Sequence, residues 1–331
     1  MEPPVQSRRH LAAQGLLVIA GLVGADLIAR ALGLEPAIGV FCLATLATLV
    51  VSSQLGWQQA LLGAVGLAVL SIPAALAQGD PLLATALMAI TGLGLGVSAR
   101  WQLQPVYWLM VVSLCLLVVE PQLAAATSGE ELIRLSGGLL LSCSLPLLAQ
   151  TVLLPQTQAR RLQRMPVQHS WRRCMAYGLL LACTSLVTTP FALQHHWHIN
   201  GLWLICTPFL VVKPFVRDGW KVALHRTLGT LAGVVLVMGL GIVVPPAMPL
   251  EIPALLMATL TGLIAAKRGH PALMLMALTA TIVLFNSNSI NLIAVADQRI
   301  QATALGLVIA LSVMGLAQPI EQRFAHRPSQ P

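Results

Sequence analysis

Long apolar segments, broken by short turns that contain proline, glycine or acidic residues, make up most of this sequence. The apolar residues do not alternate with polar ones as in a membrane β-strand, and a helix that crosses a bilayer takes ~20 apolar residues. Only 9% of the 331 residues are charged, against roughly a quarter in a soluble domain. So few charges do not cover the surface of a soluble fold of this size. The sequence therefore predicts an all-α integral membrane protein whose main partner is the lipid bilayer.

Twelve apolar segments are predicted to be transmembrane helices. Turn residues separate them, for example at Gly79-Asp80-Pro81. Two segments, 36–51 and 199–213, are short for a full crossing, which predicts helices that meet polar rims or break near a cavity. The predicted boundaries are 11–31, 36–51, 58–78, 82–98, 104–119, 132–153, 173–191, 199–213, 220–244, 250–266, 271–286 and 298–319.

A faint internal repeat relates the two halves of the chain. Glycine, tryptophan, alanine and leucine positions that follow Gly56 recur after Gly219, at an offset of 219 − 56 = 163 residues. Arg134-Leu135 and Arg299-Ile300 form a second echo. Each half holds six spans, an even number, so both halves enter the membrane from the same side. We therefore expect two parallel six-helix repeats, with Trp57 over Trp220 and Arg134 over Arg299.

The predicted organisation has three parts. Residues 1–153 form the first membrane repeat, 154–172 a short basic linker, and 173–331 the second repeat. With the N-terminus in the cytoplasm, only Arg30, Arg134 and Arg299 of the 19 lysines and arginines fall toward the outside. Basic residues concentrate on the cytoplasmic side of membrane proteins. Both termini and the linker are thus expected in the cytoplasm, and the net charge of +8 needs no nucleic-acid partner.

An arginine inside an apolar segment is the main candidate for function. Arg226 lies seven residues after Gly219, ~10 Å along a helix, and Lys221 lies five residues before it on roughly the same side. A guanidinium in a cavity between the repeats binds a carboxylate in a two-pronged contact. The alternative is that Arg226 snorkels to the cytoplasmic headgroups. The remaining predicted substrate-binding residues are Lys213 and Lys221 as charges at the cavity entrance and Arg134 and Arg299 as outer partners.

Small residues follow Arg226 at three- and four-residue spacings, a pattern typical of close helix packing. They are Thr227, Gly229, Thr230 and Gly233. Gly92, Gly94 and Gly96 are also interpreted as packing residues, because no strand and no lysine accompany them as a nucleotide loop requires.

The sequence offers no case for an enzyme, a metal site or a cofactor. The six cysteines lie in or beside apolar segments without a metal-ligand spacing. His195, His196 and His198 are close together but lack a nearby carboxylate or cysteine, so we favour a plain outer loop. The carboxylate of Asp26 is expected to pair with Arg30, four residues later on a helix.

The second half resembles the fusaric acid resistance and aromatic acid exporter family. The resemblance rests on Trp203, Pro208, Lys213-Pro214 and Trp220, followed by Arg226-Thr227-Leu228-Gly229-Thr230, and on Arg299, Thr303 and Gly306 near the last helix. It covers about 199–318 and is weak over the first half. Many members contain a large cytoplasmic domain, which this chain replaces by its short linker. The first repeat also has Gly63 in place of the arginine.

The resemblance implies a bacterial inner-membrane exporter of small organic anions, mainly aromatic carboxylates, that works beside a periplasmic adaptor protein. Plant malate channels are similar to this family, so a passive anion channel is the first alternative. A membrane scaffold without transport is the second. The sequence leaves the substrate, the driving ion and homo-oligomer formation open.

Overall fold

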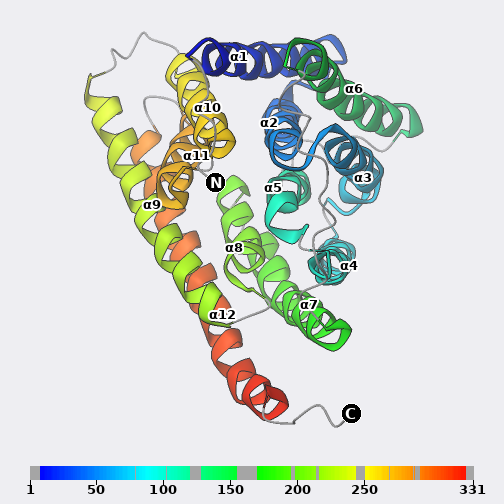
Figure 1. Cartoon of the computed structure of the whole chain (residues 1–331), viewed down its shortest axis with the longest axis vertical. Coiled ribbons are helices and arrows are strands. Elements are labelled where there is room, and N and C mark those ends of the chain that lie inside the picture. Colours follow the sequence, from blue (N-terminus) through cyan, green and yellow to red (C-terminus); the bar gives the residue numbers. More distant parts are fainter. Residues whose placement is uncertain are drawn as a thin grey trace.

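The computed structural model describes residues 8–78, 80–101, 103–119, 128–154, 170–194, 198–213, 216–243, 250–267, 269–285, 287 and 291–325. Within these residues the chain folds into twelve α-helices, with a 3-10 turn, η1 (Glu35–Ala37), before the second (Figure 1). The helices are α1 (Arg8–Ala31), α2 (Ile38–Leu55), α3 (Trp57–Leu76), α4 (Pro81–Ala99), α5 (Gln104–Val119), α6 (Gly129–Leu153), α7 (Trp171–Gln194), α8 (His198–Val211), α9 (Val216–Val243), α10 (Glu251–Ala266), α11 (Pro271–Phe285) and α12 (Leu292–Ala325).

Each of the twelve predicted segments corresponds to a helix, which confirms the all-α membrane class. Eight helical stretches in the described residues are long and apolar enough to cross a membrane, while α5, α8, α10 and α11 supply shorter apolar ones. The prediction that 36–51 falls short is wrong, because the 3-10 turn and α2 together give a 19-residue span, Glu35–Ser53. The largest boundary error is at α12, which begins at Leu292 and not at residue 298.

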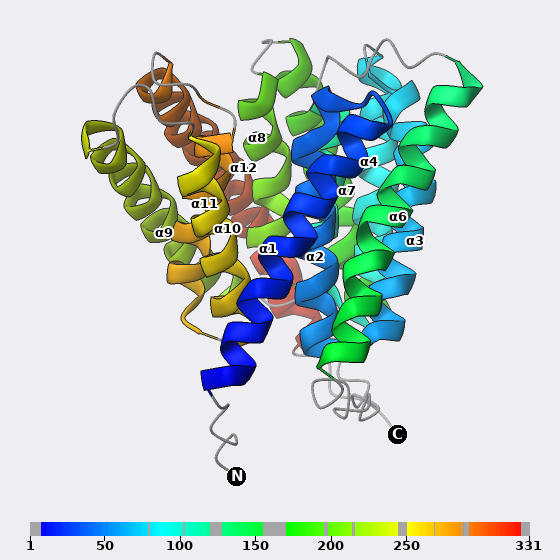
Figure 2. The ribbon, with the colours of Figure 1, turned by 90° about the horizontal axis from the view of Figure 1, so that it is seen from above.

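The helices run between two ends of the bundle. In Figure 2, α1 begins at the lower end, and α6 and α12 both finish at that same end. Four tryptophans, Trp57, Trp101, Trp171 and Trp220, lie next to helix termini at this end and are exposed. Tryptophans gather at membrane–water interfaces, so these side chains mark one surface of the bilayer.

The short helix α8 lies at the centre of the bundle. In Figure 1, α9 to α12 lie on one side of it and α2, α3 and α5 on the other. It packs against α5, α7, α9 and α12. Every residue from Gly201 to Val212 is buried. An apolar helix of this kind needs no lipid-facing side, so it can stop short of a full crossing.

Helices of the two halves pack together at α4–α7, α5–α8, α1–α10 and α2–α10. The α4–α7 and α1–α10 seams differ in tightness. At the α4–α7 seam, a Cβ on Gly96 would lie 2.5 Å from the Cα of Gly178 and 2.7 Å from the carbonyl oxygen of Cys174. The two backbones therefore touch, as close packing of small residues requires. Gly92 packs in the same way against Leu181 and Ala182.

The second seam, between α1 and α10, contains two small cavities. Each has a volume of about 20 Å³, room for one water molecule. One is lined mainly by apolar residues of α1, α2, α5, α10 and α11, including Leu22 and Ala258. The other includes the polar side chains of Gln14, Ser53 and Gln150.

Candidate functional site

Two buried arginines meet at Trp203 of α8. Trp203 is 1% exposed, and so are Arg226 and Arg299. The guanidinium carbon of Arg226 lies 5.5 Å from the centre of the Trp203 ring, and that of Arg299 lies directly over the ring. Each arginine therefore has an aromatic ring as a neighbour, which stabilises a cation through its π face.

Helix geometry places this cluster deep in the bundle. Arg226 is 226 − 216 = 10 residues from the start of α9, a distance of ~15 Å along the axis. Arg299 is 299 − 292 = 7 residues from the start of α12, or ~10 Å. The two helices start at opposite ends of the bundle, so the arginines approach Trp203 from opposite sides of the membrane. Neither side chain snorkels to water in this structure.

Arg226 is held by hydrogen bonds to α8. Its Nε and Nη2 atoms donate to the Thr207 hydroxyl oxygen at 3.3 and 2.9 Å, and Nη2 also points at the Cys206 sulfur at 3.6 Å. The Thr207 hydroxyl itself donates to the Trp203 carbonyl oxygen, one turn earlier. Thr207 therefore fixes the orientation of the Arg226 fork.

Arg299 has fewer partners. Its Nη2 atom donates to the hydroxyl of Thr279, in α11, at 3.2 Å. Its Nε and Nη1 atoms are buried without a hydrogen-bond partner, and so is the hydroxyl of Thr303, one turn later on α12. Buried polar atoms are nearly always hydrogen-bonded, so three adjacent exceptions on one helix require an explanation.

The prediction that Arg299 lies toward the outer rim is wrong. It assumed that α12 starts at residue 298, and the actual start at Leu292 moves Arg299 two turns into the helix. The expected neighbour Asp297 is exposed and accepts a hydrogen bond from Gln301. Arg134, by contrast, is exposed and pairs with Glu130 at the start of α6.

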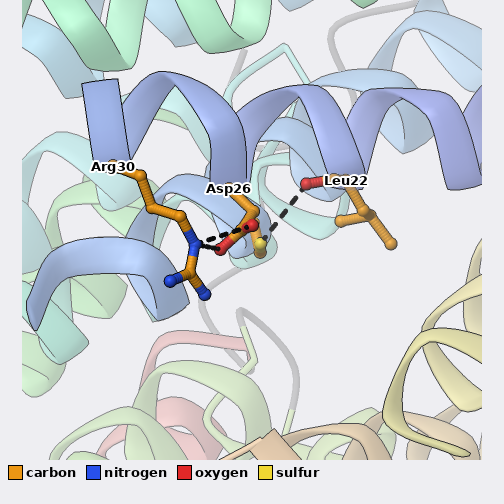
Figure 3. Close-up of polar contacts among 4 residues, drawn as sticks. Leu22, Asp26 and Arg30 are labelled. Atoms are coloured by element: carbon orange, nitrogen blue, oxygen red, sulfur yellow. Dashed lines mark hydrogen bonds and ion pairs between the residues drawn. The ribbon is translucent and has the colours of Figure 1, made fainter. Parts of the chain in front are cut away.

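No carboxylate among the described residues neutralises the two buried arginines. The ion pairs Arg134–Glu130 and Arg30–Asp26 involve neither arginine of the cluster, and the second matches the predicted i, i+4 pair at 3.0 Å (Figure 3). A buried charge without a partner costs several kcal/mol, and arginine stays protonated in proteins. The cluster is thus a strongly positive, desolvated site.

The lysines predicted at the cavity entrance do not reach this cluster. Lys221 is exposed, five residues along α9, and Lys213 is partly buried after the end of α8. Both lie at the end of the bundle where α9 begins. Arg226, Arg299 and Trp203 are each 1% exposed, so the cluster is closed in this structure.

Small residues allow the helices around the cluster to approach one another. A Cβ on Gly306 of α12 would lie 2.8 Å from the Cβ of Thr207. Gly229 and Gly233 of α9 face α11 in the same manner. A Cβ on Gly229 would lie 2.8 Å from the Ala272 carbonyl oxygen, and one on Gly233 would lie 2.7 Å from the Met276 carbonyl oxygen. Thr230 is buried beside them, while Thr227 is partly buried and bonds to its own helix. These contacts hold α9 and α12 close to α8 and α11.

Several expectations fall outside the described residues. His195 and His196 lie there, as does most of the 154–172 linker. Among the residues that the structure describes, no group of three or more His, Cys, Asp or Glu is placed to hold a metal ion.

Sequence reasoning missed Thr207 and Thr279. Their position within strongly apolar helices could have identified them, because a threonine hydroxyl there bonds either to its own helix or to a side chain of a neighbouring helix.

One family model matches the part of the chain that builds this cluster. Residues 181–313 match the family described as fusaric acid resistance protein-like. The chain carries a fusaric acid resistance protein-like domain. It runs from within α7 into α12 and includes Trp203, Arg226, Thr279 and Arg299. Neither a curated protein nor a solved structure matches the chain.

Proposed function

We propose that this protein exports small organic anions, chiefly aromatic carboxylates, across a bacterial inner membrane. The observation that carries the proposal is the pair of fully buried arginines at Trp203, with no carboxylate partner among the described residues. An ionisable residue inside a membrane is costly and rarely kept without a function. A bound anion supplies the missing negative charge.

The chemistry of the cluster favours a carboxylate. A guanidinium matches the planar geometry of a carboxylate with parallel N–H donors. The exposed Lys221 and the partly buried Lys213 add positive charge at the end of the bundle where α9 begins, which raises the local concentration of anions. The fusaric acid resistance protein-like domain contains all of these residues, in agreement with a transport function.

The proposed architecture is two parallel six-helix repeats, 1–153 and 173–331, with both termini and the linker in the cytoplasm. Helix pairing supports it: α1 packs on α2 as α7 does on α8, and α3 packs on α6 as α9 does on α12. The contacts between halves correspond as well, since α1–α10 is the counterpart of α7–α4. The shorter α5 and α11 occupy equivalent places in the order of helices.

A periplasmic adaptor protein is the proposed partner, as the resemblance of the second half to the aromatic acid exporter family implies. Most of the exposed large apolar side chains lie on the long helices and not on the four shorter ones. We propose in addition that the protein forms a homo-oligomer through this surface.

Transport by the purified full-length protein tests the proposal. Proteoliposomes loaded with radiolabelled benzoate at pH 8 should lose label faster than empty-membrane controls, and an imposed proton gradient should accelerate the loss. Flux that ignores the gradient would identify a passive anion channel in place of an exporter. Loss of label no faster than from protein-free liposomes would refute transport and favour the scaffold alternative.

A further inference from the structure

We infer that Arg299 and Thr303 contact the carboxylate of the transported anion, whereas Arg226 positions the site without being the main contact. This division of roles rests on the proposed function and names the residues that recognise the ligand. It reverses the ranking that the sequence suggests, in which Arg226 comes first. The argument depends on which donors of each side chain are already used.

The donors of Arg299 are largely unused. Nη2 bonds to Thr279, but Nε and Nη1 have no partner, and the Thr303 hydroxyl is equally unpaired. Residues 299 and 303 are one helical turn apart, so their side chains lie on the same face of α12. A carboxylate has enough lone pairs to accept from the guanidinium and from a hydroxyl together. The unpaired atoms therefore match one carboxylate group.

The donors of Arg226 are engaged in a different way. Two of its nitrogens point at Thr207, and one of these also points at Cys206. This network fixes Arg226 to α8 in the closed structure. Its positive charge still acts on an anion bound at Arg299, because both guanidiniums lie at the same Trp203 ring. Arg226 thus contributes positive charge near the bound anion and helps to hold α8 and α9 in place.

The inference makes a distinctive prediction for the ligand-free protein. Unpaired buried donors and an uncompensated buried charge destabilise the fold. Replacing them with apolar groups of similar shape should therefore raise the stability of the free protein while it lowers affinity for the anion. A residue with a purely structural role would lower both.

Thr303→Val is the sharpest variant, because valine keeps the branched shape of threonine and removes only the hydroxyl. Thr281→Val is the matched control: Thr281 is also buried, but its hydroxyl already bonds to the Ala277 carbonyl. Arg299→Leu removes the charge. Binding is measured on the full-length protein in nanodiscs by titration calorimetry with sodium benzoate, and with benzamide as the neutral analogue. Thermal unfolding without ligand is measured in parallel.

Thr303→Val should weaken benzoate binding by about tenfold to a hundredfold, the value of one hydrogen bond to a charged group, and unfold at the same or a higher temperature. Arg299→Leu should lose detectable binding, and benzamide should not bind the wild type. Thr281→Val should bind as the wild type does.

Wild-type affinity in both Thr303→Val and Arg299→Leu would overturn the inference and leave the proposed function intact. A wild-type protein that neither binds nor transports benzoate would overturn the proposed function and this inference with it. Reduced stability together with reduced affinity in Thr303→Val would also count against a ligand contact, since it indicates a structural role.

Discussion

The substitution Gly306→Ala should disable the arginine cluster without touching either arginine. The added Cβ would lie 2.8 Å from the Cβ of Thr207, 3.1 Å from its hydroxyl oxygen and 3.3 Å from the Leu204 carbonyl oxygen. Thr207 is fully buried and its hydroxyl accepts the bonds from Arg226, so it has little freedom to turn away. Overpacking of this kind costs about 1–3 kcal/mol.

The functional loss follows from the displaced hydroxyl. A hydrogen bond to a charged group contributes about 1.5–3 kcal/mol, and each 1.4 kcal/mol corresponds to about a tenfold change in affinity. Gly306→Ala should therefore weaken benzoate binding by about tenfold to a hundredfold, measured by calorimetry on the protein in nanodiscs. The rate of benzoate efflux from proteoliposomes should fall in parallel.

Gly315→Ala is the matched control on the same helix. Gly315 is exposed and has no atom within 4 Å of an added Cβ, so alanine should be tolerated and should strengthen the helix by about 0.5–1 kcal/mol. Wild-type affinity in Gly306→Ala would refute the link between the α8–α12 approach and the cluster. Equal losses in both variants would show a general sensitivity of α12 instead.

Three further predictions concern the cluster, the seam and the orientation. Arg226→Ala should abolish efflux at near-normal protein levels. Arg226→Lys should restore only part of the efflux, because one ammonium cannot reproduce the planar donor fork of a guanidinium. Full efflux in Arg226→Lys would show that the planar fork is not needed. Gly96→Ala should lower the temperature of unfolding in detergent by several degrees, since the three atoms nearest to its Cβ would be backbone atoms of α7, whereas Gly94→Ala faces open space and should not; equal behaviour of the two would disprove the close α4–α7 contact. A cysteine at position 196 should react with a membrane-impermeant maleimide in intact cells and one at 162 should not, and the reverse pattern would invert the proposed topology.

The helices could be predicted from the sequence because bilayer length and turn chemistry act locally. Arg226 could be identified for the same reason, as a charge within an apolar run. The depth of Arg299 could not, because the predicted last segment began at residue 298, whereas α12 already begins at Leu292.

The meeting of the two arginines at Trp203 depends on how α8, α9 and α12 cross, and these helices are far apart in the sequence. The resemblance of Arg134 to Arg299 was also misleading about environment. One is exposed and ion-paired, and the other is buried. A short sequence echo carries no information on the depth of a side chain.

The unequal seams between the halves have a mechanical consequence. Where α4 and α7 touch backbone to backbone, at Gly96 and Gly178, there is no clearance for sliding or tilting. The α1–α10 seam retains two voids, and displacement there changes empty volume, whereas displacement at α4–α7 would force backbone atoms into steric overlap. We therefore predict that any movement of the halves keeps the α4–α7 contact fixed and changes the separation of α1 and α10. Spin labels across the two seams would then report a distance change with benzoate only at α1–α10, and a change at α4–α7 would disprove this assignment.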